Sequence, residues 1–241
     1  MNNGQIESYK LFNIIENDTN KIICLQTKRH LLLVPIKKEI SIEAYELLKS
    51  TIEPNIVAGI EILGETNLVL RIVKDCNAKF NVIKDRLICE CEKTKEIRPC
   101  EGSLQIPTLK DIEEITRMEM DYHKEEYGDK SNCEFQETQE LVIEKFDKQS
   151  LLLWKSQNEI VSIINANFEG DLFYVFHIYT KPSQRKKGFG TNLLHEVISK
   201  IISTEKIKAG LVSQKNDIAT NKVFNEIGFV PIYEMFDIEI L

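Results

Sequence analysis

The most informative segment of the chain is Ile178-Tyr179-Thr180-Lys181-Pro182-Ser183-Gln184-Arg185-Lys186-Lys187-Gly188-Phe189-Gly190-Thr191. The apolar residues at 172–180 predict a strand, and Pro182 ends it because proline cannot donate to a sheet ladder. Apolar pairs then recur at helical spacing, so a helix is expected over residues 190–203. The stretch therefore joins a strand to an amphipathic helix through a short basic loop.

This loop combines two glycines with four basic residues, Lys181, Arg185, Lys186 and Lys187. Glycines let the backbone turn tightly and bring its N–H groups close to a ligand. Free N–H groups at a helix start favour an anion. The combination is typical of a phosphate site, and the local alternative is a solvated basic loop that caps a helix. Neither G-x-x-x-x-G-K-[ST] nor G-x-G-x-x-G is present, which excludes those two nucleotide-binding motifs.

Three segments carry a resemblance to the GNAT N-acetyltransferases. The opening stretch resembles their acetyl-CoA motif, a V-Y-T-x-P strand end followed by R/Q-x-x-G-x-G/A. Residues 220–229, TNKVFNEIGF, resemble the family's N-x-h-Y-x-x-h-G-F, where h is apolar. Tyr122-His123-Lys124-Glu125-Glu126 resembles the Y-x-K-E-E of a bacterial subgroup with an extra N-terminal region. The resemblance covers roughly residues 107–241.

The resemblance implies an α/β fold, with a mixed sheet, flanking helices and a GNAT-like acyl-CoA site. In that fold two adjacent parallel strands splay apart, here those ending near Thr180 and Val212, and acetyl-CoA lies between them. The pantetheine arm then pairs with backbone groups that the splay leaves open. The implied acetyl-CoA contacts are Ile178, Tyr179, Thr180, Arg185, Lys186, Lys187, Gly188, Phe189, Gly190, Thr191, Asn221 and Phe224.

The chemistry implied is direct transfer of an acetyl group to an amine, helped by positioning and by general acid–base groups. The family often has a tyrosine acid where this chain has Phe224, and phenylalanine cannot donate a proton. Tyr174 is the candidate catalytic residue, with a residue that only lines the cleft as the alternative. Glu125 and Glu126 are candidates for holding the amine, or else a solvated helix end. His177 and Trp154 are expected to be structural.

Two functions of different classes follow. The first is an acetyl-CoA-dependent N-acetyltransferase that acts on a small-molecule or protein amine. The second, prompted by Phe224, is a non-catalytic acyl-CoA-binding regulatory module. The amine acceptor stays open, because one fold and one acyl donor serve enzymes with unrelated acceptors.

The rest of the chain predicts two domains, because Pro99 and Gly102 place two breakers close together before the pattern changes. Residues 1–105 form a smaller α/β domain, for which a degenerate GNAT-like half is one hypothesis, and residues 106–241 form the acetyltransferase domain. In the first, strands are expected at 22–25, 31–34 and 68–73, a half-buried strand pair at 80–91, a helix at 42–51, and either a strand or a helix at 56–62. In the second, helices are expected at 111–127, 136–147, 190–203 and 219–227, and strands at 151–154, 159–168, 172–180, 209–212 and 232–241.

Composition excludes several classes of protein. The chain has 241 residues, is 42% apolar and carries a net charge of −7, which disfavours general nucleic-acid or anionic-membrane binding. No apolar run approaches the roughly 20 residues of a membrane span, and residues 1–5 do not resemble a signal peptide. A cytoplasmic protein is therefore expected, with its six cysteines reduced. Cys89, Cys91 and Cys100 lack paired C-x2-C spacing, so no metal is expected. The oligomeric state stays open, with a homodimer among the alternatives.

Overall fold

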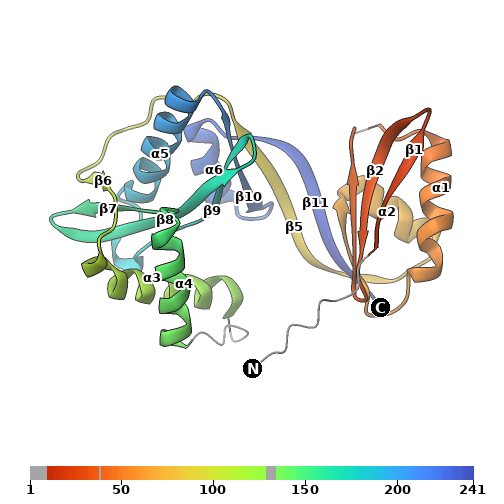
Figure 1. Cartoon of the computed structure of the whole chain (residues 1–241), viewed down its shortest axis with the longest axis horizontal. Helices are drawn as coiled ribbons and strands as arrows, with labels where there is room; N and C mark the ends of the chain where they lie inside the picture. The colour runs from red at the N-terminus through yellow and green to blue at the C-terminus, as the bar shows by residue number, and fades with distance from the viewer. Residues whose placement is uncertain (1–9, 38, 129–133) are drawn as a thin grey trace. The chain divides into compact units, whose positions relative to one another are not determined.

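A computed structural model describes residues 10–37, 39–128 and 134–241 and divides the chain into two compact units. Unit 1 contains the chain up to Ile88, together with Gln214–Asn216 and Ile232–Leu241. Unit 2 contains Cys89–Ser213 and Asp217–Pro231. Residues 89–105, which the sequence assigned to the first domain, thus belong to the unit that carries the motifs. Each unit is an α/β structure with a mixed sheet, and the predicted fold class is confirmed (Figure 1).

Unit 1 is built from a meander of three strands, two helices and three further strands. In chain order these are β1 (Lys10–Glu16), β2 (Thr19–Gln26), β3 (His30–Pro35), α1 (Ile42–Ile52), η1 (Glu53–Asn55), β4 (Glu61–Glu65), α2 (Thr66–Asp75), most of β5 (Phe80–Cys91) and most of β11 (Val230–Ile240). The pairs β1–β2 and β2–β3 are antiparallel, β3–β4 is parallel and β4–β11 is antiparallel. Tyr45 and Leu48 of α1 pack, fully buried, into an apolar core with Ile22 and Ile62 of the sheet.

Two sequence predictions in unit 1 need correction. Residues 68–73 were expected to form a strand but lie in α2, where Leu68, Val69, Ile72 and Val73 are buried. That spacing of one, four and five residues places all four on one helix face, and the Glu65 side chain caps the helix by accepting from the N–H of Leu68. Residues 56–62 form neither one strand nor one helix, because β4 begins only at Glu61.

Unit 2 begins with the end of β5 and contains both parallel and antiparallel strand pairs. Its elements are β6 (Ser103–Gln105), η2 (Leu109–Asp111), α3 (Ile112–Tyr127), α4 (Phe135–Asp147), β7 (Leu151–Ser156), β8 (Glu159–Glu169), β9 (Leu172–Thr180), η4 (Pro182–Gln184), α5 (Phe189–Glu205), β10 (Lys208–Gln214) and α6 (Ile218–Ile227). The strands β6, β7, β8 and β9 pair antiparallel in that order, and β10 pairs parallel to β9. Figure 1 shows α3 and α4 on one side of this sheet and α5 on the other.

A capping box between Thr108 and Asp111 caps η2, the 3-10 helix that leads directly into α3. Asp111 accepts from the Thr108 backbone N–H at 2.7 Å and from Lys155 Nζ at 2.7 Å. The far edge of the sheet is held by Trp154, which is 1% exposed and donates its indole N–H to the carbonyl of Glu101. The prediction that Trp154 belongs to the core is confirmed. None of the helices in the described part of the chain is long and apolar enough to cross a membrane.

Candidate functional site

The parallel strands β9 and β10 are paired only along the first part of their length. Their parallel register runs from Leu172 opposite Lys208 to Val175 opposite Leu211, whereas β9 continues to Thr180 and β10 to Gln214. Beyond Leu211, the edge of β9 that faces β10 therefore has no paired strand within the described residues. An open edge of this kind accepts an extended ligand by main-chain hydrogen bonds. The sequence prediction of a splayed pair matches this register.

The basic loop lies at the open end of this gap. Lys186 and Gly188 both have positive φ, at 62° and 87°, and Gly188 is the N-cap of α5. Backbone that alternates in this way turns successive N–H groups toward one concavity, which suits an anion. Gly190 packs directly on β9, because a Cβ at that position would lie 2.7 Å from Thr180 Oγ1. The glycines thus allow the left-handed cap and the close approach of helix to strand.

Two of the four basic residues are already paired with carboxylates of α3. Arg185 Nη2 donates to both carboxylate oxygens of Glu125, at 2.7 and 2.9 Å, and Arg185 Nε donates to the carbonyl of Thr180 at 2.9 Å. Lys181 forms an ion pair with Glu114. Lys187 instead donates to the neutral amide of Gln184 at 2.8 Å. The cationic charge left for a bound anion therefore rests mainly on Lys186 and Lys187.

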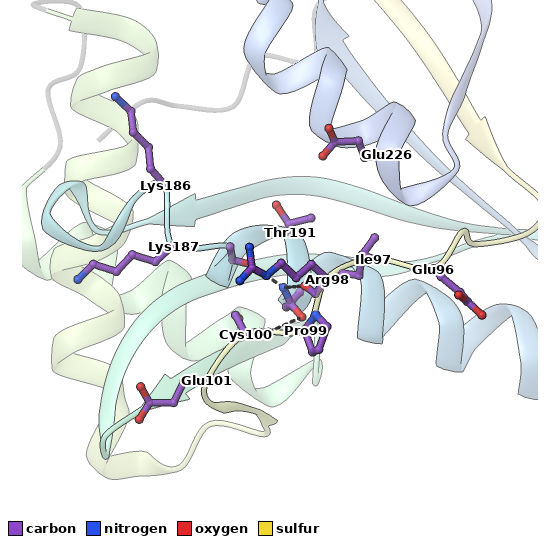
Figure 2. Close-up of a pocket in the computed structure, with 12 residues that line it drawn as sticks. Glu96, Ile97, Arg98, Pro99, Cys100, Glu101, Lys186, Lys187, Thr191 and Glu226 are labelled. Carbon is purple, nitrogen blue, oxygen red and sulfur yellow. Dashed lines mark hydrogen bonds between the residues drawn. The ribbon is translucent and has the colours of Figure 1, made fainter.

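A pocket of about 650 Å³ opens beside this loop (Figure 2). One wall is the loop and the first turn of α5, with Lys186, Lys187, Gly188, Thr191 and Asn192. The opposite wall is residues 96–101 of an irregular segment before β6, which we call the strap and define as residues 94–101.

Asn192 joins the two walls, a role that sequence reasoning missed. Its side-chain amide donates to the carbonyls of Arg98 at 3.2 Å and Gly188 at 3.0 Å, and its oxygen accepts from the N–H of Cys100 at 3.3 Å. The side chain is buried, with 6% of the residue exposed. The signal in the sequence is an asparagine four residues after the cap glycine, next to the apolar pair Leu193-Leu194.

The remaining residues predicted to contact acetyl-CoA offer either main-chain or side-chain groups. Ile178 and Thr180 lie on the part of β9 beyond the paired register. Phe189 is buried, with 7% exposed, so a ligand can reach only its main chain at the helix start. Tyr179 is also buried, and its hydroxyl donates to Glu125 at 3.2 Å rather than facing the gap.

The downstream motif places Asn221 and Phe224 differently. Asn221 accepts a hydrogen bond from Ser213 near the end of β10, so it lies at the strand that borders the gap. Phe224 is 8% exposed, and its ring meets Phe229 edge-on at 6.0 Å between centroids. The Phe224 side chain therefore lies on the buried face of α6 and offers no proton donor.

Tyr174 lies at the closed end of the gap. It is opposite Gly210 in the β9–β10 register, one residue before the pairing ends. Its ring meets that of Phe176 edge-on at 4.9 Å, and the residue is half-buried. This position puts Tyr174 near the point where a thioester inserted from the open end would stop.

His177 belongs to a separate buried cluster against α3. Its Nε2 is 3.0 Å from Glu119 Oε1, Lys145 donates to the other carboxylate oxygen at 3.0 Å, and the ring stacks on Tyr122 at 4.4 Å. Burial by itself raises the pKa of Glu119, but the hydrogen bond and charge of His177 and the charge of Lys145 outweigh it and lower that pKa. The structure thus places His177 within a buried polar network.

The two glutamates proposed to hold the amine lie in the last turn of α3. Glu125 is engaged by Arg185 and Tyr179, and burial together with the charges of Glu125 and Asp121 raises the pKa of Tyr179 to about 12. Glu126 follows it and is exposed. An amine that used Glu125 would therefore have to displace Arg185.

The cysteines and metal ligands give no further site in the described part of the chain. Cys24, Cys76, Cys89, Cys91 and Cys100 are free, and Cys133 lies outside the described residues. Burial raises the pKa of the Cys89 and Cys91 thiols, which makes them poor nucleophiles and ligands. Within residues 10–37, 39–128 and 134–241, no group of three or more His, Cys, Asp or Glu side chains is arranged to hold a metal ion.

Comparisons with known proteins agree with this geometry. No curated protein matches the sequence significantly. Similar solved structures include an acetyltransferase of the GNAT family from Colwellia psychrerythraea, with a TM-score of 0.64 at 13% identity over 96% of this chain and 85% of that one. A GCN5-related N-acetyltransferase from Sphaerobacter thermophilus gives a TM-score of 0.60 at 10% identity over 93% of this chain and 78% of that one.

A third similar structure is a tandem GNAT protein from the clavulanic acid biosynthesis pathway, with a TM-score of 0.54 at 7% identity over 97% of this chain and 82% of that one. At such identities these structures establish the fold alone. Residues 112–229 match the family model described as the Acetyltransferase (GNAT) family, and this range spans α3 to the end of the downstream motif. With its splayed strands and glycine-containing helix start, the chain therefore carries a domain of the GNAT acetyltransferase family.

Proposed function

We propose that this protein transfers an acetyl group from acetyl-CoA directly to an amine acceptor. The observation that carries the proposal is the β9–β10 register, which ends at Val175 and Leu211 and leaves a gap that leads to the loop at 185–190. The groups present fit the donor: the open edge of β9 suits the pantetheine arm, and the left-handed Gly188 before α5 suits the diphosphate. When bound, acetyl-CoA supplies the thioester whose carbonyl carbon an amine attacks.

The side chains of this chain would contribute positioning and one proton. In the transfer a C–N bond forms and the C–S bond breaks, so the amine loses a proton and the leaving sulfur gains one. Tyr174, at the closed end of the gap, is the residue we assign to donate that proton from its hydroxyl. Phe224 cannot do so, and the Tyr179 hydroxyl is committed to Glu125.

A second candidate is a regulatory module that binds acyl-CoA without turnover. The burial of Phe224 against Phe229 favours it, because the position where the family often has an acid is here part of the core. The acceptor is a small-molecule or protein amine in the first case and absent in the second. For both candidate functions the proposed location is the cytoplasm, in keeping with the five free cysteines of the described residues.

The two candidates are separated by two measurements on the same protein. Isothermal titration with acetyl-CoA tests donor binding, and both candidates fail if none is observed. Thiol release from acetyl-CoA across a panel of small amines and peptide N-termini then tests turnover, and a pure binding module releases none.

The role of Tyr174 is tested by Tyr174→Phe, which removes only the hydroxyl. Loss of a general acid lowers kcat by a factor of about 100 or more, whereas the affinity for acetyl-CoA stays unchanged. Tyr127→Phe, on the exposed last turn of α3, is the matched control. Equal kcat values for wild type and Tyr174→Phe would mean that Tyr174 only lines the cleft.

We also propose that unit 1 is a degenerate half of the same fold. Its order of three meander strands, helix, parallel strand and helix (β1, β2, β3, α1, β4, α2) repeats that of β7, β8, β9, α5, β10 and α6. The β3–β4 register, however, extends to Leu33 and Gly64, one residue before β4 ends, and no glycine lies between residues 36 and 41. Unit 1 therefore lacks both the gap and the loop, and titration should show one acetyl-CoA per chain rather than two.

A further inference from the structure

The strap is fixed along one face of α5. Besides Asn192, two more residues of that helix hold it: His195 Nε2 lies 3.0 Å from the carbonyl oxygen of Lys95, and Ser199 donates to Thr94 Oγ1 at 2.8 Å. Residues 192, 195 and 199 follow helical spacing and so share a face. Lys95 itself donates to the carbonyl and side-chain oxygens of Asn225 on α6, at 2.8 and 2.9 Å. The strap is thus an ordered wall, although it lies before the family match, which begins at residue 112.

The charges that line the pocket make Arg98 decisive. The other cations that line the pocket are Lys186 and Lys187, and the carboxylates that line it are those of Glu96, Glu101 and Glu226. Without Arg98, two lysines would face three glutamates, and a polyanion would be repelled. The backbone carbonyl of Arg98 is held by Asn192, while its guanidinium forms no ion pair with a described residue. In the view of Figure 2, the Arg98 side chain extends from the strap in the direction of the loop.

We propose that the strap is the second wall of the coenzyme site and that Arg98 binds the 3′-phosphate of coenzyme A. This inference rests on the proposed function, which places the diphosphate at the loop amides. A guanidinium offers a planar fork of donors that matches a phosphate group, and charge-assisted bonds of this type are about twice as strong as neutral ones. The pocket volume of about 650 Å³ is in the usual range for a small-molecule site.

The test compares acetyl-CoA with acetyl-3′-dephospho-coenzyme A by isothermal titration on the full-length protein. Wild type is expected to bind acetyl-CoA about tenfold more tightly than the dephospho donor. Arg98→Gln should weaken acetyl-CoA binding by about that factor and leave the affinity for the dephospho donor unchanged. Arg98→Lys should restore part of the preference. Lys93→Gln, which removes an exposed cation from the same stretch outside the pocket, should leave both affinities unchanged.

The possible failures are distinguishable. If wild type binds neither donor, the proposed function is wrong and this inference falls with it. If wild type binds both donors equally, or if Arg98→Gln weakens both equally, donor binding stands but the assignment of the 3′-phosphate to Arg98 is overturned. Thermal denaturation of each variant, which is expected to match wild type because Arg98 is exposed, shows whether a loss of affinity reflects misfolding.

Discussion

At the scale of single residues, Gly190 has less room for a side chain than Gly188, the other glycine of the loop. The Cα of Gly190 faces Thr180 Oγ1 so closely that a methyl group would lie at 2.7 Å, and Thr180 Oγ1 is itself 2.7 Å from Ser162 Oγ. Separation of α5 from β9 would relieve the contact but would also move the amides of the helix start. We therefore expect Gly190→Ala to weaken acetyl-CoA binding about tenfold, as measured by isothermal titration.

The double variant Gly190→Ala/Thr180→Ala provides the control. It removes the hydroxyl that the new methyl group would meet, so it should recover affinity relative to Gly190→Ala alone. If the double variant binds as weakly as the single one, the loss has a cause other than this contact.

Glu119 gives the second prediction at this scale. Its pKa is lowered in the folded protein from the ordinary value of 4.5, so its contribution to stability is present above that pH and is lost as the pH falls through the folded-state pKa. Glu119→Gln should reduce the free energy of unfolding at pH 7 by about 2 to 3 kcal/mol, because His177 and Lys145 lose a charged partner. It should also flatten the decline in stability below about pH 5.

Urea denaturation at pH 7, 5.5 and 4 measures both effects. Glu113→Gln is the control, since the Glu113 carboxylate is exposed and, among the described residues, pairs only with Arg117 one turn away. Parallel pH profiles for wild type and Glu119→Gln would mean that the acid limb of stability originates elsewhere.

At the scale of elements, α3 sets the effective charge of the coenzyme loop. Glu125 and Glu114 pair with Arg185 and Lys181, so the two cations nearest to the strand end are largely neutralised. Among the described residues, Lys187 pairs with the neutral side chain of Gln184 and with no carboxylate. We expect Lys187→Ala to weaken acetyl-CoA binding about tenfold, and Arg185→Gln by less than about threefold.

Titration at two salt concentrations checks this ranking, since screening weakens exposed charges. The loss caused by Lys187→Ala should shrink at high salt, while Arg185→Gln should respond little. A larger loss for Arg185→Gln would show that the arginine leaves Glu125 to bind the ligand.

The same pairs show where sequence reasoning succeeds at this scale. The strand, loop and helix of the decisive stretch were predictable, because Pro182, Gly188 and the apolar periodicity of α5 act locally. The partner of Arg185 was not predictable, because 60 positions separate it from Glu125 and only packing of α3 on the sheet brings them together. Residues 68–73 were misassigned for a related reason: their apolar run suits a strand or a buried helix, and the capping contact from Glu65 decides for the helix.

At the scale of the whole molecule, each unit has a core of its own. Leu48 of α1 is fully buried in the unit 1 core, while its neighbour Leu47 is 49% exposed. Leu48→Ala should lower the free energy of unfolding of unit 1 by about 2 to 5 kcal/mol, because it removes buried methyl groups and leaves a cavity. Leu47→Ala should change it by less than about 0.5 kcal/mol.

Amide hydrogen exchange read by peptide resolves the two units. Leu48→Ala should accelerate exchange in α1, α2 and β1 to β4, and acetyl-CoA at saturation should slow exchange in β9, the loop and α5. If Leu48→Ala accelerated exchange more in α5 than in α1, the two cores would not be independent.

The sequence alone predicted the acyl-CoA motif, the α/β class and most elements, because these depend on local rules of turn chemistry and periodicity. It also determined that Phe224 cannot act as an acid. Tertiary packing, in contrast, determines which cations stay available, how Asn192 joins the two walls and that residues 96–101 line the pocket. Those contacts join positions more than 50 residues apart, and a pattern that repeats every two to four residues carries no information about them.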